Sequence, residues 1–341
     1  MNLLKKYGAG LLLTVLLGFA AVYISGFIPY HLISAGVFAL LIGMLLNPIV
    51  SKYSGFKSGV ALVSRQVLRL AIILMGVTLS FSQVLQVGKY SLIVMCFTLI
   101  TAFAGGYLLG KAFGMNWKLS GLISAGTGIC GGSAIAAIAP TIDADDRDIA
   151  YAISATFIFD VLMVILFPIA GRYFGMSDMG FGLWAGTAVN DTSSVVAAGY
   201  AFSDAAGAFS MIVKLTRTLS IIPTVLIFSF VNERLEHKKA AASGQATVRK
   251  QVNLKKIFPY FILMFLGMVA LKSTGLVSDA VSATVSDFSK FFMVMALGAI
   301  GLKTNFKEVS HSGFKPMLHG FIISALVVVV SFLVQMCMGQ L

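Results

Sequence analysis

Hydrophobic runs long enough to cross a bilayer, about 20 residues each, recur along the whole of this 341-residue chain. Hydrophobic residues make up 58% of the chain and charged residues only 11%, whereas a soluble domain carries about 25% charged residues. An apolar helix satisfies its own backbone hydrogen bonds in lipid. The sequence therefore predicts an all-α polytopic membrane protein without a soluble domain of ordinary size.

About eleven transmembrane helices are expected. The first is predicted to be an uncleaved helix, because its apolar run continues to Ile28, beyond the length of a signal peptide. The candidate spans are residues 10–28, 31–50, 66–82, 90–110, 119–139, 149–171, 181–201, 205–231, 257–275, 289–303 and 316–338.

The basic residues predict the orientation, because lysine and arginine gather in cytoplasmic loops. With the N-terminus inside and eleven alternating spans, 19 of the 25 basic residues lie inside and 4 lie outside. This predicts an inner-membrane protein with a cytoplasmic N-terminus and a periplasmic C-terminus. The acidic loop 143–148 is placed outside and Arg172 inside. The same bias explains the net charge of +12, so the charge does not indicate a nucleic-acid partner.

Composition divides the chain into three parts. Residues 1–231 form a first transmembrane region, 232–256 a polar cytoplasmic linker, and 257–341 a C-terminal transmembrane region. The three cysteines, Cys96, Cys130 and Cys337, lie inside apolar segments without the spacing of a metal site or a disulfide framework. No metal and no cofactor are predicted.

Two glycine-rich segments interrupt the fifth and seventh spans. Residues 126–132 contain four glycines, and each lowers helix stability by about 1 kcal/mol relative to alanine. Residues 190–194 place five polar side chains at mid-membrane depth. Close helix packing is an alternative explanation for the glycines, but it does not explain the polar run.

Such a pair of broken helices indicates a transporter site near the midplane. An interrupted helix leaves free N–H groups at one new end, which attract anions, and free C=O groups at the other, which attract cations. The candidate substrate- or ion-binding residues are Gly126, Thr127, Gly128, Cys130, Gly131, Gly132, Ser133, Thr187, Asn190, Asp191, Thr192, Ser193 and Ser194.

Charged residues lie within the same spans. Asp160 is near the middle of the sixth span, and Lys214 and Arg217 are one turn apart in the eighth. A charge in the bilayer marks a functional site by default, so we expect Asp160, Asp191, Lys214 and Arg217 to converge on one polar cavity. The basic pair would be counter-charges or an anion clamp, and Asp160 or Asp191 would carry a proton. A static contact for Asp160, and snorkelling for Lys214 and Arg217, are the alternatives.

The repeat symmetry is less regular. Residues 75–80 and 297–302 resemble each other and run in opposite directions, as an inverted repeat requires. The two glycine-rich segments run in the same direction by the same count. Either one of them is re-entrant, or their likeness is convergent.

Together the segments Gly126-Thr-Gly-Ile-Cys-Gly-Gly-Ser-Ala-Ile-Ala-Ala and Gly186-Thr-Ala-Val-Asn-Asp-Thr-Ser-Ser-Val resemble the bacterial YeiH-like family, which carries a sulfate-exporter label. The resemblance covers about residue 30 to the C-terminus. It implies a fold similar to bile-acid symporters and sodium/proton antiporters, with a panel domain, a core domain and crossed broken helices. It also implies a homodimer. The Asn190-Asp191 pair further resembles the ion site of electroneutral sodium/proton antiporters.

Two functions follow as expectations. The first is an elevator-type secondary transporter that exports a small anion, such as sulfate or a sulfonate, coupled to a proton or cation gradient. The second is a monovalent cation/proton antiporter that uses Asn190, Asp191 and Asp160. An enzyme is not favoured, because the four histidines fall in loops or at predicted membrane edges. A channel is not favoured either, because the charges follow no pore pattern.

Overall fold

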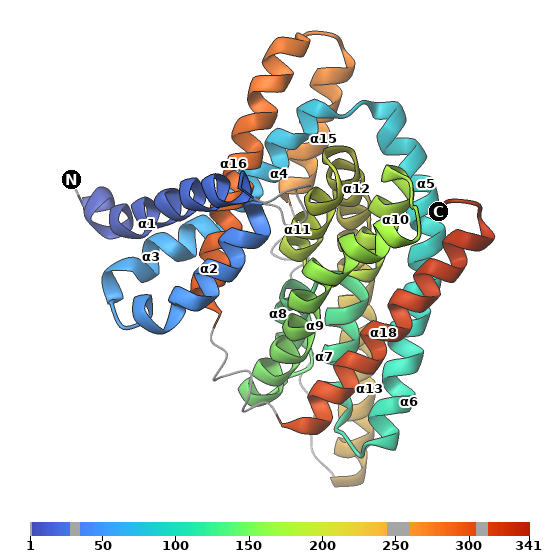
Figure 1. The fold of residues 1–341 in the computed structure, drawn as a ribbon. Coiled ribbons are helices and arrows are strands. Elements are labelled where there is room, and N and C mark those ends of the chain that lie inside the picture. Colours follow the sequence, from blue (N-terminus) through green and yellow to red (C-terminus); the bar gives the residue numbers. More distant parts are fainter. Residues whose placement is uncertain (1, 28–34, 244–259, 305–312) are drawn as a thin grey trace.

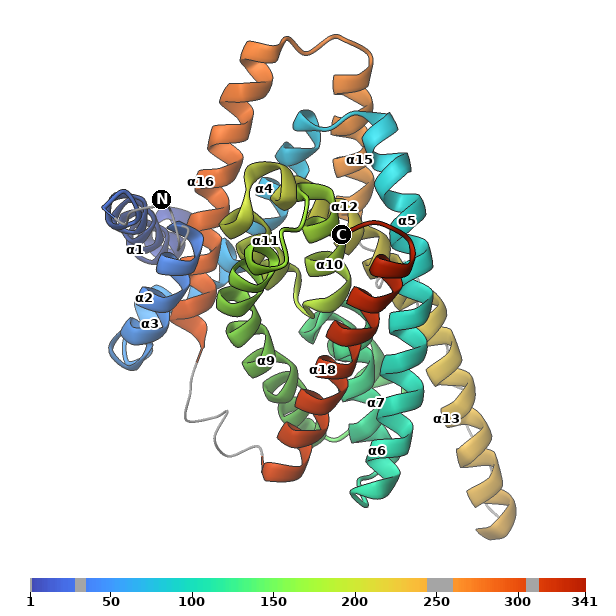
Figure 2. The same cartoon turned by 45° about the vertical axis from the view of Figure 1, so that its right-hand side comes forward.

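The computed structural model describes residues 2–27, 35–243, 260–304 and 313–341. All regular elements in this part of the chain are helices. They pack into two groups that lie side by side (Figures 1 and 2). We call them the panel group and the core group.

The panel group combines the two ends of the chain, because α15 and α16 pack on the first helices rather than on the last. It comprises α1 (Asn2–Ser25), α2 (Ala35–Val50), α3 (Ser54–Leu62) with a π-helical turn, η2 (Val63–Val67), α4 (Leu68–Met75) with a 3-10 turn, η3 (Gly76–Thr78), α15 (Tyr260–Ser273) and α16 (Asp279–Lys303).

The core group holds both glycine-rich segments. It comprises α5 (Phe81–Ile100), η4 (Thr101–Gly105), α6 (Gly106–Ala112), α7 (Trp117–Ala125), η5 (Gly126–Cys130), α8 (Gly132–Ile138), η6 (Ala139–Thr141), α9 (Asp146–Tyr173), α10 (Asp178–Ala188), α11 (Thr192–Phe202), α12 (Asp204–Leu219), α13 (Ile221–Ser243) and α18 (Phe314–Cys337).

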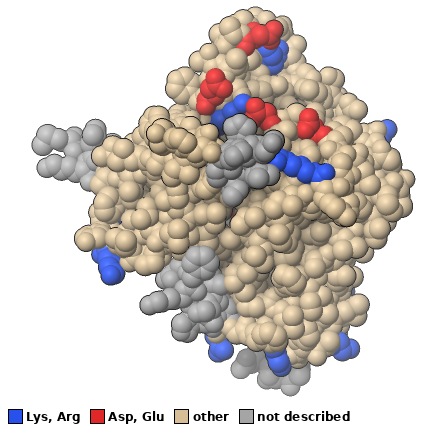
Figure 3. Space-filling view, in the orientation of Figure 1, with Lys and Arg blue, Asp and Glu red and all other residues tan. Residues whose placement is uncertain are grey.

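The structure has the surface of a membrane protein. Within the described residues, seven helices are long and apolar enough to cross a bilayer. Large apolar side chains point outward along α5, α6, α13 and α18, among them Leu85, Leu108, Ile227 and Leu333. Figure 3 shows acidic side chains only toward the upper end, where basic ones lie beside them, and further basic side chains toward the lower margin, with a largely uncharged band between. The predicted class, an all-α polytopic membrane protein, is confirmed.

Each of the eleven predicted spans overlaps a helical segment, but two of these segments do not cross. We call the end of the molecule where α6 meets α7 the lower face, and the end where α9 meets α10 the upper face. The 28 residues of α9 run between the two faces, a length of about 42 Å at 1.5 Å per residue.

The first glycine-rich segment is a re-entrant hairpin, residues 117–141. It enters from the lower face as α7 and η5, turns at Gly131 and returns as α8 and η6. Its two ends meet: Lys118 Nζ donates to the Asp143 carbonyl over 2.7 Å, and Asn116 Nδ2 donates to Asp148 Oδ2 over 2.8 Å. The predicted crossing at 119–139 is therefore wrong, and the acidic loop 143–148 lies on the same face as the start of the segment.

The second glycine-rich segment is also a hairpin, residues 178–202, and it enters from the upper face. Its ends meet as well, because Ser203 Oγ donates to Asp178 Oδ1 and Arg172 Nη2 donates to the Ala201 carbonyl. The predicted crossing at 181–201 is thus also wrong, and Arg172 lies on the opposite face from the one expected. The two segments enter from opposite faces, which removes the conflict with an inverted repeat.

Glycines in the panel group permit close helix contacts. A Cβ on Gly301 would lie 2.1 Å from the Leu40 carbonyl oxygen, and one on Gly43 would lie 2.4 Å from the Gly298 carbonyl oxygen. Asn47 Nδ2 then reaches the Leu302 carbonyl over 2.7 Å. The glycines of segment 297–302 therefore bring α16 against α2.

The predicted linker is partly helical. The helix α13 continues to Ser243, so residues 232–243 extend the eighth span. The remainder of the predicted linker falls on 244–259, outside the described residues. The division of the chain at this linker stays a prediction.

Candidate functional site

The first hairpin presents a row of free carbonyl groups at its tip. Its first half ends in the π-helical turn η5, and the chain then turns at Gly131, whose φ of 63° and ψ of −134° suit glycine only. Because the helix stops there, the carbonyls of residues 127–129 have no partner in a following turn. They carry the partial negative charge of a helix C-terminus.

The second hairpin has a matching tip. The helix α10 ends at Ala188, Val189 and Asn190 are non-helical, and Asp191 caps α11 by accepting the Ser193 N–H over 2.9 Å. The tips touch: a Cβ on Gly131 would lie 3.2 Å from the Asp191 Cβ. The two helix breaks thus form one site between the faces.

Lys214 joins the two tips from α12. Its Nζ donates to the Ile129 carbonyl over 2.8 Å, to the Val189 carbonyl over 3.1 Å, and to the Asn190 carbonyl. The side chain is completely buried. Three donors meet three carbonyls, so the ammonium group is saturated.

Arg217 does the same one turn further along α12. Its Nε donates to the Gly128 carbonyl, its Nη1 to the Val189 carbonyl over 3.2 Å, and its Nη2 to the Thr127 carbonyl. Hydrogen bonds from charged donors contribute about 1.5–3 kcal/mol each. The two cations therefore hold the C-terminal ends of both broken helices together, and these bonds do not form an anion clamp.

Asp160 completes the charge pattern from α9. Its Oδ1 accepts the Asn190 N–H over 2.7 Å, and its Oδ2 accepts the Asp191 N–H over 2.9 Å. The carboxylate is fully buried. An anion therefore meets the free N–H groups of a broken helix and the cations meet free carbonyls, as the helix dipole favours.

Polar side chains of α18, which are not among the predicted site residues, bind both hairpins. Ser324 Oγ lies 3.4 Å from Thr127 Oγ1 and accepts from Asn190 Nδ2 over 3.2 Å. Ser331 Oγ lies 2.6 Å from Thr187 Oγ1. The two serines are seven residues apart, two helical turns on one face, and this spacing was the signal that could have found them.

All predicted site residues lie in the two hairpins or in α9 and α12, which pack against them. Only some of these residues are accessible. Gly132, Ser133, Asp191 and Thr192 keep accessible surface at the tips. The buried ones are Gly126, Thr127, Gly128, Cys130, Gly131, Asp160, Thr187, Asn190, Ser193, Ser194, Lys214 and Arg217. An incoming ion would first meet the four accessible residues.

One buried polar atom at the tips lacks a partner. The amide oxygen Oδ1 of Asn190 makes no hydrogen bond, although the residue is completely buried.

His319, expected near a membrane edge, is buried in α18 and contacts the Gly106 carbonyl over 2.9 Å. Within the described residues, no group of three or more His, Cys, Asp or Glu side chains could hold a metal ion.

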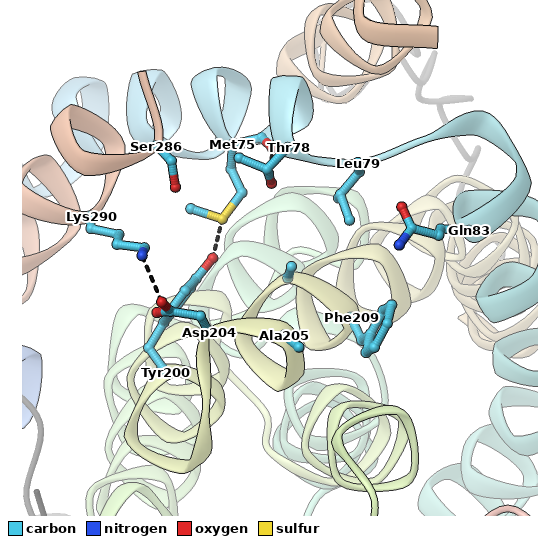
Figure 4. Close-up of a pocket in the computed structure, with 11 residues that line it drawn as sticks. Met75, Thr78, Leu79, Gln83, Tyr200, Asp204, Ala205, Phe209, Ser286 and Lys290 are labelled. Atoms are coloured by element: carbon cyan, nitrogen blue, oxygen red, sulfur yellow. Dashed lines mark hydrogen bonds and ion pairs between the residues drawn. The ribbon is translucent and has the colours of Figure 1, made fainter. Parts of the chain in front are cut away.

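A cavity of about 310 Å³ lies between the panel and core groups near the upper face. Lys290 of α16 and Asp204 of α12 form an ion pair across it, with 2.7 Å between Nζ and Oδ2 (Figure 4). Its lining includes Met75, Thr78, Tyr200, Asp204, Ser286 and Lys290. The cavity reaches Phe209, which is five residues before Lys214 on α12.

Comparison with known proteins agrees with the membrane fold. The model of the family "Conserved hypothetical protein 698" matches residues 9–320. A UPF0324 membrane protein of Clostridium tetani is 70% identical over 100% of both chains. UPF0324 membrane proteins of Streptococcus pneumoniae and Streptococcus agalactiae are 41% and 38% identical over 99% of both chains. The resemblance to the YeiH-like family is confirmed, and the chain belongs to the UPF0324 family of membrane proteins.

Proposed function

We propose that this protein is a secondary active transporter whose ion site lies where the two hairpin tips meet. The observation that carries the proposal is the pair of re-entrant hairpins that enter from opposite faces and touch at Gly131 and Asp191. Non-helical backbone at membrane depth occurs where protein or a water-filled cavity surrounds it. Interrupted helices in paired positions mark the substrate sites of transporters.

Alternating access follows from this geometry. Each hairpin separates the tips from one face, so movement of the core group against the panel group would open the site to either side. Glycine-mediated crossings hold the helices of each group closely together, at Gly43 and Gly301 in the panel group and at Gly182 and Gly199 in the core group. Between the groups lies the cavity near the upper face. An elevator movement of the core group is the transport step that we propose.

The substrate that we favour is a small anion such as sulfate or a sulfonate. Gly132 and Ser133 lie in the first turn of α8 and Thr192 in the first turn of α11, and the free N–H groups at the start of a helix attract anions. Because the donors of Lys214 and Arg217 already bind carbonyls, the anion would bind beside the pair at Gly132, Ser133 and Thr192. Proton or cation coupling would use Asp191 or Asp160.

A second function, monovalent cation/proton antiport, is favoured by a different observation. Asp191 keeps accessible surface, and the neighbouring Asn190 Oδ1 has no hydrogen-bond donor. Carboxylate and amide oxygens are ligands suited to a hard cation.

Flux in proteoliposomes tests both functions. We expect radiolabelled sulfate to move faster than in protein-free vesicles, with a rate that depends on an imposed pH gradient, and radiolabelled sodium not to move. Sodium flux without sulfate flux would transfer the assignment to the antiporter. Unchanged rates and pH profiles in both Asp160→Asn and Asp191→Asn would contradict the coupling role of these carboxylates.

The remaining expectations are also proposals. The lower face is cytoplasmic, the protein lies in the bacterial inner membrane, and two copies form a homodimer. No enzymatic step is required of any residue in the site.

A further inference from the structure

Backbone oxygens from both helix breaks enclose the ammonium group of Lys214. The carbonyls of Ile129, Val189 and Asn190 accept its three hydrogen bonds. Ile129 belongs to the first hairpin, and the other two residues belong to the second. None of these oxygens comes from α12 itself, so the cage is formed by the hairpin tips and Lys214 fills it from outside.

Such a cage suits a monovalent cation. Carbonyl oxygens at the C-terminal ends of half-helices coordinate sodium in transporters with interrupted helices, because these ends carry partial negative charge. The ammonium group has the same unit charge as a sodium ion. Its nitrogen lies 2.8 and 3.1 Å from two of the oxygens, which are ordinary hydrogen-bond distances.

We propose that the ammonium group of Lys214 occupies a latent monovalent-cation site at the hairpin tips, so that the protein binds no sodium there, and that removal of this group opens the site to sodium. The consequence of this cation site for transport rests on the proposed function, because it matters only if the hairpin tips are the ion site of a transporter. With the site filled by the chain, sodium is excluded as the coupling ion at the tips, and the proton is the coupling ion that remains.

The charges around the cage support the exchange of one cation for another. The groups that face Lys214 are Asp160 from α9, Asp191 at the start of α11, Arg217 from α12 and the Cys130 thiol from η5. The two carboxylates, Asp160 and Asp191, therefore balance the charges of the two cations, Lys214 and Arg217. Loss of one cation leaves a net negative charge in a buried site, and an uncompensated buried charge is strongly unfavourable.

Lys214→Met is the sharpest variant, because the methionine side chain ends where the lysine side chain has its Cε. The apolar stem is kept and only the place of the ammonium nitrogen is left open. Lys290→Met is the matched control, since it makes the same change in the ion pair with Asp204 at the upper cavity. All three proteins are purified in choline chloride and titrated with sodium chloride at constant ionic strength.

We expect sodium to leave the apparent Tm of the unsubstituted protein and of Lys290→Met unchanged. The Tm of Lys214→Met should be lower in choline and should rise by at least about 3 °C in a saturable manner, as a ligand of the native state requires. Radiolabelled sodium should bind to Lys214→Met with a stoichiometry near one, and not to the unsubstituted protein.

Two results would overturn the proposal. One is folded Lys214→Met whose Tm and sodium binding do not differ from those of the control. The other is saturable sodium binding by the unsubstituted protein, a measurement that decides the matter even if Lys214→Met does not fold. Both readouts are independent of flux, so a failure of this inference and a failure of the transporter assignment are distinguishable.

Discussion

Gly131 is the residue at which the first hairpin reverses. Its backbone conformation, φ 63° and ψ −134°, is one that residues with a Cβ rarely adopt, and a Cβ there would lie 3.2 Å from that of Asp191. We therefore expect Gly131→Ala to lower the free energy of unfolding by about 1–3 kcal/mol. Thermal denaturation in detergent measures the change.

Gly132 is the matched control for this substitution. It is the next residue, it lies in α8, and nothing is within 4 Å of a Cβ built on it. Gly132→Ala should therefore change stability by less than about 0.5 kcal/mol or increase it. Equal losses from both substitutions would show that the positive φ of Gly131 is not what the turn requires.

For single residues, the sequence predicts which charged side chains belong to the site, but it does not predict the groups that they bind. Asp160, Lys214 and Arg217 are recognisable because a charge inside an apolar span must be paired, and the structure places all three at the hairpin tips. Their partners are backbone N–H and C=O groups, which every residue carries. A sequence therefore cannot show that the cations bind carbonyls rather than an anion.

Among the elements, the crossing of α2 and α16 depends most on glycine. A Cβ on Gly301 would lie 2.1 Å from the Leu40 carbonyl oxygen. Because this oxygen belongs to the backbone, the clash can be relieved only if the two helices move apart. Gly301→Ala should lower the free energy of unfolding by about 2–3 kcal/mol, in the range of overpacked cores. Denaturation monitored by tryptophan fluorescence or by loss of monodispersity measures it.

Gly88, within α5, provides the comparison for this crossing. Nothing lies within 4 Å of a Cβ at this position, so Gly88→Ala should stabilise the helix by about 0.5–1 kcal/mol. A loss at Gly88 as large as the loss at Gly301 would contradict the packing explanation.

The broken helices could be located from their glycines and polar run, but their return to the starting face could not. Residues 119–139 are apolar enough to cross a bilayer, and a hydrophobic run does not reveal whether it is one helix or two halves. The halves on either side of Gly131 are each shorter than the roughly 20 residues that a crossing needs. What makes them a hairpin is contact between distant residues, such as Lys118 with Asp143.

For the whole molecule, the two hairpins leave the predicted orientation intact. Two crossings are lost together, so the helices after residue 203 keep the direction expected from eleven spans. Arg147 and Arg172 exchange sides, which keeps the distribution of basic residues at 19 against 4. The positive-inside rule thus gives the same overall orientation for both topologies and cannot distinguish between them.

Side-specific labelling of single cysteines does distinguish them, in a chain whose native cysteines are replaced. Asp145 and Tyr173 are exposed and become the test positions, while Lys111 and Leu276 mark the lower and upper faces. In sealed vesicles, we predict that an impermeant maleimide labels Asp145→Cys together with Lys111→Cys, and Tyr173→Cys together with Leu276→Cys. If Asp145→Cys is labelled with Leu276→Cys and Tyr173→Cys with Lys111→Cys, both segments cross the membrane and the paired hairpins are wrong.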